Sequence, residues 1–150
     1  MRLTLYSDYA LRLMMYLAVR PDGLATISQV AKAYGVSANH MMKVVHQLGQ
    51  AGYLETVRGR SGGIRLAKPP EAIGLGELVR FTEPDMDIVP CFQPENEDCP
   101  LRRTCRLKGA LDRARLAFLS VLDEYTLADL TSPSGPMRSF LGLAVGASAT

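Results

Sequence analysis

Three cysteines stand close together in the second half of the chain and are its only cysteines. Cys91, Cys99 and Cys105 are separated by seven and then five residues. Thiolates are soft ligands that suit iron–sulfur clusters or zinc, and a long loop can wrap around either group. Three is an odd number and cytosolic thiols are kept reduced, so a disulfide framework accounts for them poorly. The cluster of cysteines therefore predicts a metal site, with the metal still open.

The residues around these cysteines exert two opposing electrostatic effects. Cys99 and Pro100 come just before a long expected helix, whose unpaired N–H groups and dipole favour a thiolate and an anionic cluster. Six acidic residues lie between Glu83 and Asp98 and repel one another. We therefore expect the empty loop to be open and disordered, and a metal to order it.

A second group of polar residues fits DNA recognition. Outward residues of a helix can contact base edges and phosphates in a major groove. A thin, glycine-rich hairpin at 58–63 can approach a phosphate or enter a minor groove. Solvated surface arginines are the alternative for the hairpin alone, but helix, turn, helix and basic hairpin in this order favour DNA binding. The predicted DNA contacts are Ser37, Asn39, His40, Lys43, Gln47, Arg58, Arg60 and Ser61.

Two other assignments of these segments are less favoured. His40 and His46 could ligate a metal, but on an exposed recognition helix we favour base or phosphate contact, or plain solvation. The glycines at 59–63 could suggest a nucleotide-binding loop. No Gly-Lys-Ser/Thr follows them, and Ile64 begins a strand rather than a helix, so we discard a nucleotide site.

Hydrophobic periodicity predicts a mainly α fold that positions these residues. Thr4, Thr26 and Ser37 are the expected N-caps, and Gly35 supplies the left-handed residue that ends the second helix. Apolar residues recur with period two on either side of the glycine-rich tip, which indicates a short β-hairpin wing. The expected helices span 4–19, 26–34, 37–51 and 75–82, and the expected strands span 53–57 and 64–66.

A long helix is expected after the last cysteine, with one coiled-coil-like apolar seam that is too short to stand alone. After Leu130 the chain turns to Ser, Pro, Gly and other small residues, which predicts a mobile tail. We therefore expect a winged helix-turn-helix domain over 1–70, the cysteine loop and long helix over 71–130, and the tail over 131–150. The seam residues are Leu107, Leu111, Ala114, Phe118, Val121 and Tyr125.

The charge distribution supports this division of the chain. Residues 1–70 hold nine Lys or Arg against three Asp or Glu, whereas the remaining 80 residues hold eight against twelve. A basic half suggests a phosphate-facing module, with ordinary scatter of solvated charge as the alternative. No segment reaches the ~18 apolar residues of a membrane span, and no signal-peptide cleavage site is evident. We expect a cytoplasmic protein that does not contact a membrane.

Together these motifs resemble the Rrf family of bacterial iron–sulfur winged-helix repressors, the NsrR/IscR type, and most of all its nitric-oxide-sensing members. The likeness covers about residues 1–130 and leaves only the tail unmatched. Wing and cysteines together form a specific signature, whereas either alone would be weaker. The matching motifs are Met1-Arg2-Leu3-Thr4 with Tyr6 to Leu11, Leu48-Gly49-Gln50-Ala51-Gly52-Tyr53, Arg58-Gly59-Arg60-Ser61-Gly62-Gly63-Ile64, Leu66-Ala67-Lys68-Pro69-Pro70, and the three cysteines.

The resemblance implies a homodimer formed through the long C-terminal helix, with one cluster per subunit and a fourth ligand that is not cysteine. IscR-like members use a histidine shortly after the last cysteine, and residues 106–108 contain none. Other members use an acidic residue of the first helix, contributed by the partner subunit, and Asp8 matches it. A first-turn carboxylate that only complements the helix dipole is the alternative for Asp8. A 4Fe-4S cluster is favoured, with 2Fe-2S as the alternative.

The same resemblance implies a transcription repressor of double-stranded DNA with a two-fold symmetric operator. Nitric oxide would nitrosylate the cluster and release the DNA. An iron- or thiol-status regulator of the same fold and a regulator with structural zinc are the nearest alternatives. An electron-transfer or radical enzyme would more often have four cysteines and a polar cleft, so we predict no enzyme activity and no catalytic residues.

Overall fold

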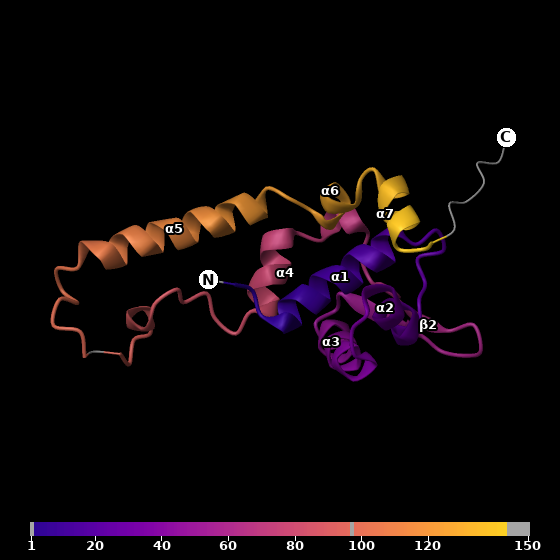
Figure 1. Cartoon of the computed structure of the whole chain (residues 1–150), viewed down its shortest axis with the longest axis horizontal. Coiled ribbons are helices and arrows are strands. Elements are labelled where there is room, and N and C mark those ends of the chain that lie inside the picture. Colours follow the sequence, from indigo (N-terminus) through magenta and orange to yellow (C-terminus); the bar gives the residue numbers. More distant parts are fainter. Residues whose placement is uncertain (1, 97, 144–150) are drawn as a thin grey trace.

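The computed structural model describes residues 2–96 and 98–143, which form a mainly helical fold with one antiparallel hairpin (Figure 1). No helix in this part of the chain is both long and apolar enough to cross a membrane. The α-helices are α1 (Leu5–Val19), α2 (Ile27–Tyr34), α3 (Ala38–Gln50), α4 (Leu75–Thr82), α5 (Arg106–Asp123), α6 (Leu127–Thr131) and α7 (Ser134–Phe140). The strands are β1 (Leu54–Val57) and β2 (Gly63–Leu66), and two short 3-10 helices span Pro70–Ala72 and Pro90–Phe92.

The central helix of the core is α1. It is apolar around most of its circumference, so it can be buried on several sides. Leu13, Met14 and Leu17 are almost completely inaccessible to solvent, and α1 packs against α2, α3, α4 and α6. Thr4 begins the helix as predicted, because its hydroxyl accepts a hydrogen bond from the Ser7 N–H at 3.2 Å.

The helix-turn-helix consists of α2 and α3, and local contacts fix two of its junctions. Thr26 forms a capping box with Gln29 at the start of α2. Gly35 ends α2 in the left-handed conformation, with φ of +64°, as predicted. Ser37 precedes α3 at the expected position, but its side chain makes no capping hydrogen bond. The predicted side-chain cap at Ser37 is therefore wrong, and this exposed hydroxyl is left open to another partner.

The wing is the hairpin of β1 and β2, and it is fixed to the helices at its base. Leu54 pairs with Leu66 in the antiparallel register. Ile64 also pairs with Ala25 in the α1–α2 connection, through two backbone hydrogen bonds of 2.8 and 3.0 Å. A side chain at Gly63 would clash with the backbone of Ala25, so this close approach requires glycine. The base of the wing is therefore held in a defined position relative to the helix-turn-helix.

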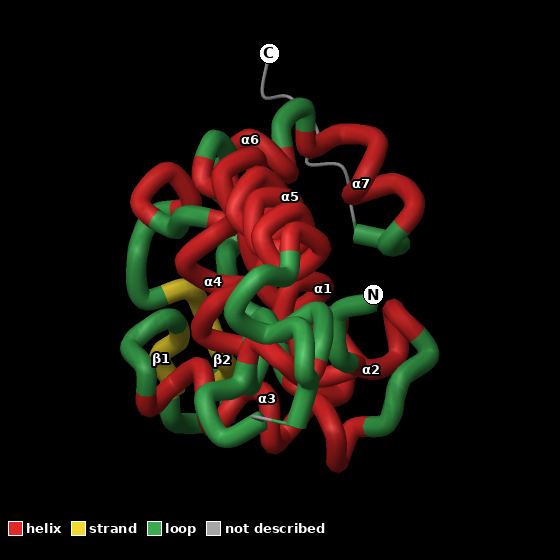
Figure 2. Tube along the Cα trace, turned by 90° about the vertical axis from the view of Figure 1, so that its left-hand side faces the viewer, coloured by secondary structure: helices red, strands yellow, loops and turns green. Residues whose placement is uncertain are grey.

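The long helix α5 projects from the helical body with the cysteine loop beside it, and Figure 2 views this helix nearly end-on. It is attached to the body near its C-terminal end. The Arg80 guanidinium of α4 donates two hydrogen bonds to the Asp123 carboxylate, at 2.6 and 2.7 Å. That carboxylate lies where a side chain at Gly76 would stand. Glycine at this position therefore allows the ion pair to connect α4 with α5.

The segment after Leu130 has more regular structure than the sequence predicts. Where a mobile tail was expected over 131–150, residues Ser134–Phe140 form α7. Arg138 Nε donates to the Val19 carbonyl at the end of α1, at 2.6 Å, and Leu143 is buried in the core. These contacts with α1 explain the difference over 131–143, and the rest of the expected tail lies outside the described residues.

The apolar core also continues across the expected boundary at residue 70. Ile73, Leu78 and Leu127 belong to the same buried cluster as the residues of α1 and α3. The expected helix seam ends earlier than predicted, because Tyr125 lies beyond the last residue of α5. The DNA-binding half and the C-terminal helices therefore share one core.

Candidate DNA-binding surface and cysteine loop

Helix α3 buries one side against the core and exposes the other. An α-helix repeats every 3.6 residues, so residues three, four and seven positions apart share a face. The buried stripe is Met41, Val44, Val45 and Leu48. The exposed residues on the other side, which we call the outer stripe, are Asn39, Met42, Lys43, His46 and Gln50, with Met42 at the edge toward β1.

The predicted DNA contacts on α3 are all exposed, but they divide between the centre and one edge of the exposed surface. Asn39 and Lys43 belong to the outer stripe. His40 lies toward α1, because its ring centre is 6.2 Å from that of Tyr9. Gln47 lies on the same edge and lines a groove between α3, α1 and α4.

Sequence reasoning did not single out Met42 and Gln50, and it left His46 between DNA contact and plain solvation, although all three are exposed on α3. The spacing of the buried stripe contains the signal that could have found them, since it fixes which residues lie on the opposite side. A search for polar residues alone passes over Met42 because its side chain is apolar. Met42 is nevertheless 55% exposed.

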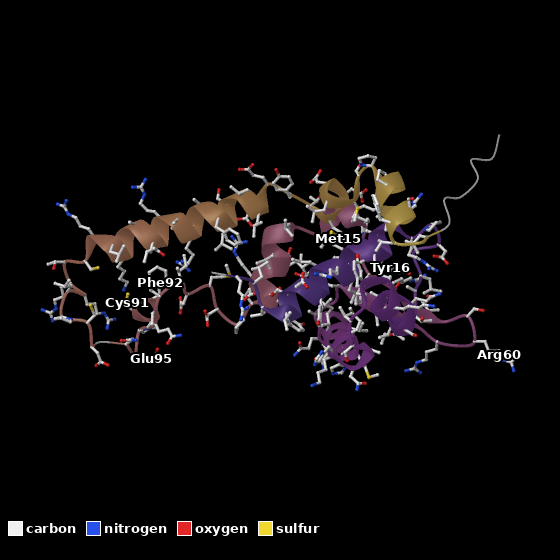
Figure 3. All side chains as sticks on the ribbon, in the orientation of Figure 1. Met15, Tyr16, Arg60, Cys91, Phe92 and Glu95 are labelled. Carbon is white, nitrogen blue, oxygen red and sulfur yellow. The ribbon has the colours of Figure 1, made fainter. Side chains whose placement is uncertain are left out.

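The wing tip carries the remaining predicted contacts. Arg58, Arg60 and Ser61 are exposed, and Figure 3 shows Arg60 extending away from the helices. Within the described residues neither of these arginines forms an ion pair, whereas Arg65 on β2 pairs with Glu55. The two guanidinium groups at the tip therefore have no carboxylate to compete with a phosphate for their donors.

The three cysteines are free thiols in the connection between α4 and α5. Cys91 lies in a short 3-10 helix next to Phe92 (Figure 3), and Cys99 is exposed. Cys105 is the N-cap of α5, where its sulfur accepts a hydrogen bond from the Lys108 N–H at 3.4 Å. Among the described residues, no three His, Cys, Asp or Glu side chains gather closely enough to hold a metal ion. The structure places the predicted thiol ligands in one loop but does not bring them together.

The chemistry of these donors nevertheless fits a soft metal group. All three sulfurs are reduced thiols at least partly open to solvent, so no disulfide competes for them. The Arg102 guanidinium donates to the carbonyls of Asn96 and Pro94, at 3.1 and 3.3 Å, and so folds the middle of the loop back on itself. The N–H that meets Cys105 would also donate to a metal-bound sulfur. The donor set therefore fits an iron–sulfur cluster or zinc if the loop closes further.

Asp8 lies in the first turn of α1 and forms an ion pair with Arg12, one helical turn further along the same helix. The Arg12 guanidinium is 3.0 Å from its carboxylate, and both side chains are about 40% exposed. The same guanidinium lies 5.6 Å from the ring centre of Tyr34. Within the described part of a single chain, Asp8 therefore belongs to an ion pair and not to a ligand group with the cysteines.

The cysteine loop begins at a hydrogen-bonded link to α1. Glu83 Oε1 accepts hydrogen bonds from the Thr4 N–H at 2.8 Å and from the Thr4 hydroxyl at 3.1 Å. Glu83 also lines a groove of about 880 Å³ together with Lys43 and Gln47 of α3. This Glu83–Thr4 link therefore joins the first residue of the loop to the start of α1, across a groove from the recognition helix.

Comparison with known proteins identifies the family. A profile of the Rrf2 family, described as iron-dependent transcriptional regulators, matches residues 3–133. The chain belongs to the Rrf2 family. The HTH-type transcriptional regulator NsrR of Shouchella clausii is 49% identical over 142 residues, which cover 94% of this chain and 95% of that protein. NsrR of Bacillus subtilis is 53% identical over 131 residues, which cover 87% and 90%.

Solved structures agree with the Rrf2 assignment. The global cysteine regulator CymR of B. subtilis superposes with a TM-score of 0.70 at 28% identity, over 89% of this chain and 98% of that one. IscR of T. potens gives a TM-score of 0.73 over 92% and 91%, and at 22% identity this likeness shows the fold alone. The predicted mainly α, winged-helix fold is confirmed. As an Rrf2 protein, the chain is a transcription regulator and not an enzyme.

Proposed function

We propose that this Rrf2 protein is a homodimeric repressor in the cytoplasm that carries an iron–sulfur cluster and releases DNA in response to nitric oxide. The main observation behind the proposal is that a loop with three free thiols begins at the Glu83–Thr4 link, beside the recognition helix. The NsrR regulators that match about half of all positions over nearly the whole chain give it further support.

DNA binding would use α3 and the wing of each subunit. The outer stripe offers amide, ammonium and imidazole groups to base edges in the major groove. Arg58 and Arg60 would bind phosphates or the adjacent minor groove. A two-fold symmetric dimer would read two half-sites about 34 Å apart, so a small change in the separation of the helices would misalign both.

The exposed apolar residues of α5 support dimerisation through this helix. Leu107 is 66% exposed, and Val121, two heptad repeats further along the same face, is 52% exposed. A helix that projects from the body with such residues in water is an unfavourable arrangement for a monomer. A second copy of α5 would cover them and would fix the distance between the two recognition helices.

Cys91, Cys99 and Cys105 would hold the cluster, with Asp8 of the partner subunit as the fourth ligand. When bound, the cluster supplies iron with which nitric oxide reacts, and a 4Fe-4S cluster is favoured over 2Fe-2S. Carboxylate oxygen can ligate iron. Separating this carboxylate from Arg12 would cost less than about 1 kcal/mol, since the ion pair is partly exposed.

The Glu83–Thr4 link offers a route from the loop to the DNA-binding surface. Closing the loop around three thiolates would fix its first residue, and through it the start of α1 and the groove beside α3. Opening the loop would remove that constraint. Moving a two-state equilibrium from mostly bound to mostly free requires about 5.5 kcal/mol, which the loss of several metal–thiolate bonds can supply.

Single cysteine substitutions test the proposal. Cys91→Ala, Cys99→Ala and Cys105→Ala, purified anaerobically, should each dimerise but lack a stable cluster and specific DNA binding. Leu101→Ala is the matched control, because this exposed residue of the same loop has no thiol, and it should keep full iron and sulfide. Retention of full iron and sulfide by one cysteine variant would remove that residue from the site.

The same samples separate the alternatives. If the protein contains zinc and shows no visible absorption bands, the site holds a structural metal and not an iron–sulfur cluster. Metal-free protein that binds its operator until its thiols are alkylated would instead support a thiol switch.

A further inference from the structure

We propose that Met42 contacts the C5-methyl group of a thymine in the major groove and thereby contributes to operator specificity. The inference rests on the proposed function, because it requires α3 to lie in the major groove. Met42 is the one apolar member of the outer stripe, and it is 55% exposed. It lies at the edge of the exposed side of α3, three residues from buried Val45, and faces the hollow beside α2 and β1.

The surface next to Met42 leaves room for a group from DNA. A hollow of about 490 Å³ lies between α3, the start of α2 and β1. There is space beside Gly49 in this hollow, since a Cβ atom added there would meet only the Leu54 carbonyl oxygen, at 4.0 Å. The flexible thioether of Met42 can adapt its shape to a small apolar group at the rim. The hollow is lined by Ile27, Met42, Val45, His46, Gly49, Gln50, Leu54 and Thr56.

The neighbours of Met42 favour DNA over a protein as the occupant. Asn39 and His46 flank it on the helix, and the apolar Val45 and Leu54 on its other side are buried, whereas a protein-binding site usually needs a continuous exposed apolar patch. Residues 1–70 also carry nine basic against three acidic residues, which attracts a polyanion. The thymine methyl is the apolar group that the major groove presents, and it lies among polar base edges. A single exposed methionine flanked by polar side chains on the helix matches that pattern.

Replacing thymine with deoxyuridine tests this contact, because the change removes only the methyl group. The operator is first selected from random duplex DNA with the full-length, cluster-loaded dimer, and each thymine is then replaced in turn. Burial of one methyl group corresponds to roughly a fourfold change in affinity, or about 15-fold when both half-sites are changed. We expect this loss at one thymine per half-site with the native protein. With Met42→Ala the loss of affinity on replacing that thymine should fall below about twofold, while Met42→Leu should retain the native loss.

Lys43→Ala is the matched control on the same stripe. It should weaken binding to the operator with thymine and to the operator with deoxyuridine by the same factor, because Lys43 interacts with DNA through charge. The ratio of the two affinities should therefore stay unchanged. A ratio that survives in Met42→Ala, or native binding that is insensitive to every thymine methyl, would overturn the assignment of Met42. If Lys43→Ala and Arg60→Ala both leave affinity and its salt dependence unchanged, the proposed DNA-binding surface itself is wrong.

Discussion

Removing the Glu83 carboxylate tests how the cysteine loop is connected to the recognition helix. One carboxylate oxygen accepts two hydrogen bonds from Thr4, at 2.8 and 3.1 Å, in a partly buried position. A hydrogen bond to a charged group contributes roughly 1.5–3 kcal/mol, and partial exposure reduces this contribution. We expect Glu83→Ala to lower the free energy of unfolding in urea by about 2 kcal/mol. Glu83→Gln keeps an acceptor oxygen and should lower it by less than about 1 kcal/mol.

The same substitution should weaken the coupling between cluster and DNA. In the native protein, removing the cluster should weaken operator binding. The quantity to measure is the ratio of operator affinity with the cluster to operator affinity without it, by anaerobic fluorescence anisotropy at fixed salt. If the Glu83–Thr4 link contributes about 1.4 kcal/mol to the coupling free energy, this affinity ratio should fall about tenfold in Glu83→Ala, although the cluster still binds. Thr4→Ser keeps both donors and should leave stability and ratio unchanged. A Glu83→Ala protein that is less stable but retains the native affinity ratio would refute a relay through Glu83.

Three further predictions concern the wing, the α4–α5 contact and Asp8. Arg60→Ala should reduce the slope of log affinity against log salt by about 2 for the dimer, and an unchanged slope would mean that the wing is not at the DNA. Gly76→Ala should lower the melting temperature despite the better helix propensity of alanine, because the added methyl clashes with Asp123. Gly109→Ala in α5 is the control, because a Cβ atom added there would meet no atom within 4 Å, and it should raise the free energy of unfolding by roughly 0.5–1 kcal/mol. Effects of the same sign in the two variants would contradict this explanation. Asp8→Asn should fold and dimerise but alter the visible circular dichroism and lifetime of the cluster, whereas unchanged spectra would leave Asp8 as a surface ion pair.

Much of the DNA-binding half could be predicted because its elements depend on local chemistry. Thr4 and Thr26 begin helices through hydrogen bonds to residues three positions away, and Gly35 ends a helix through its own backbone conformation. The buried stripe of α3 follows from its spacing alone. Because these interactions join residues close together in the chain, they can be predicted from residue types and spacing in one sequence.

The features that sequence reasoning missed depend on residues far apart in the chain. Arg138 binds the Val19 carbonyl across 119 positions, so the composition of the C-terminal segment suggested a tail where a helix packs. The Glu83–Thr4 link spans 79 positions and gives the cysteine loop a defined start. Cys105 was expected as a loop residue, and its role as the N-cap of α5 depends on where that helix begins. Such contacts form only when distant segments fold together.

Native mass spectrometry of the anaerobically purified protein with its operator, before and after nitric oxide, tests the central claim most directly. We expect a complex of two chains, one DNA duplex and one iron–sulfur cluster per chain, and we expect nitric oxide to release the DNA from the dimer. A complex that contains zinc or no metal would contradict the proposed function. So would a complex that stays intact after every cluster has reacted.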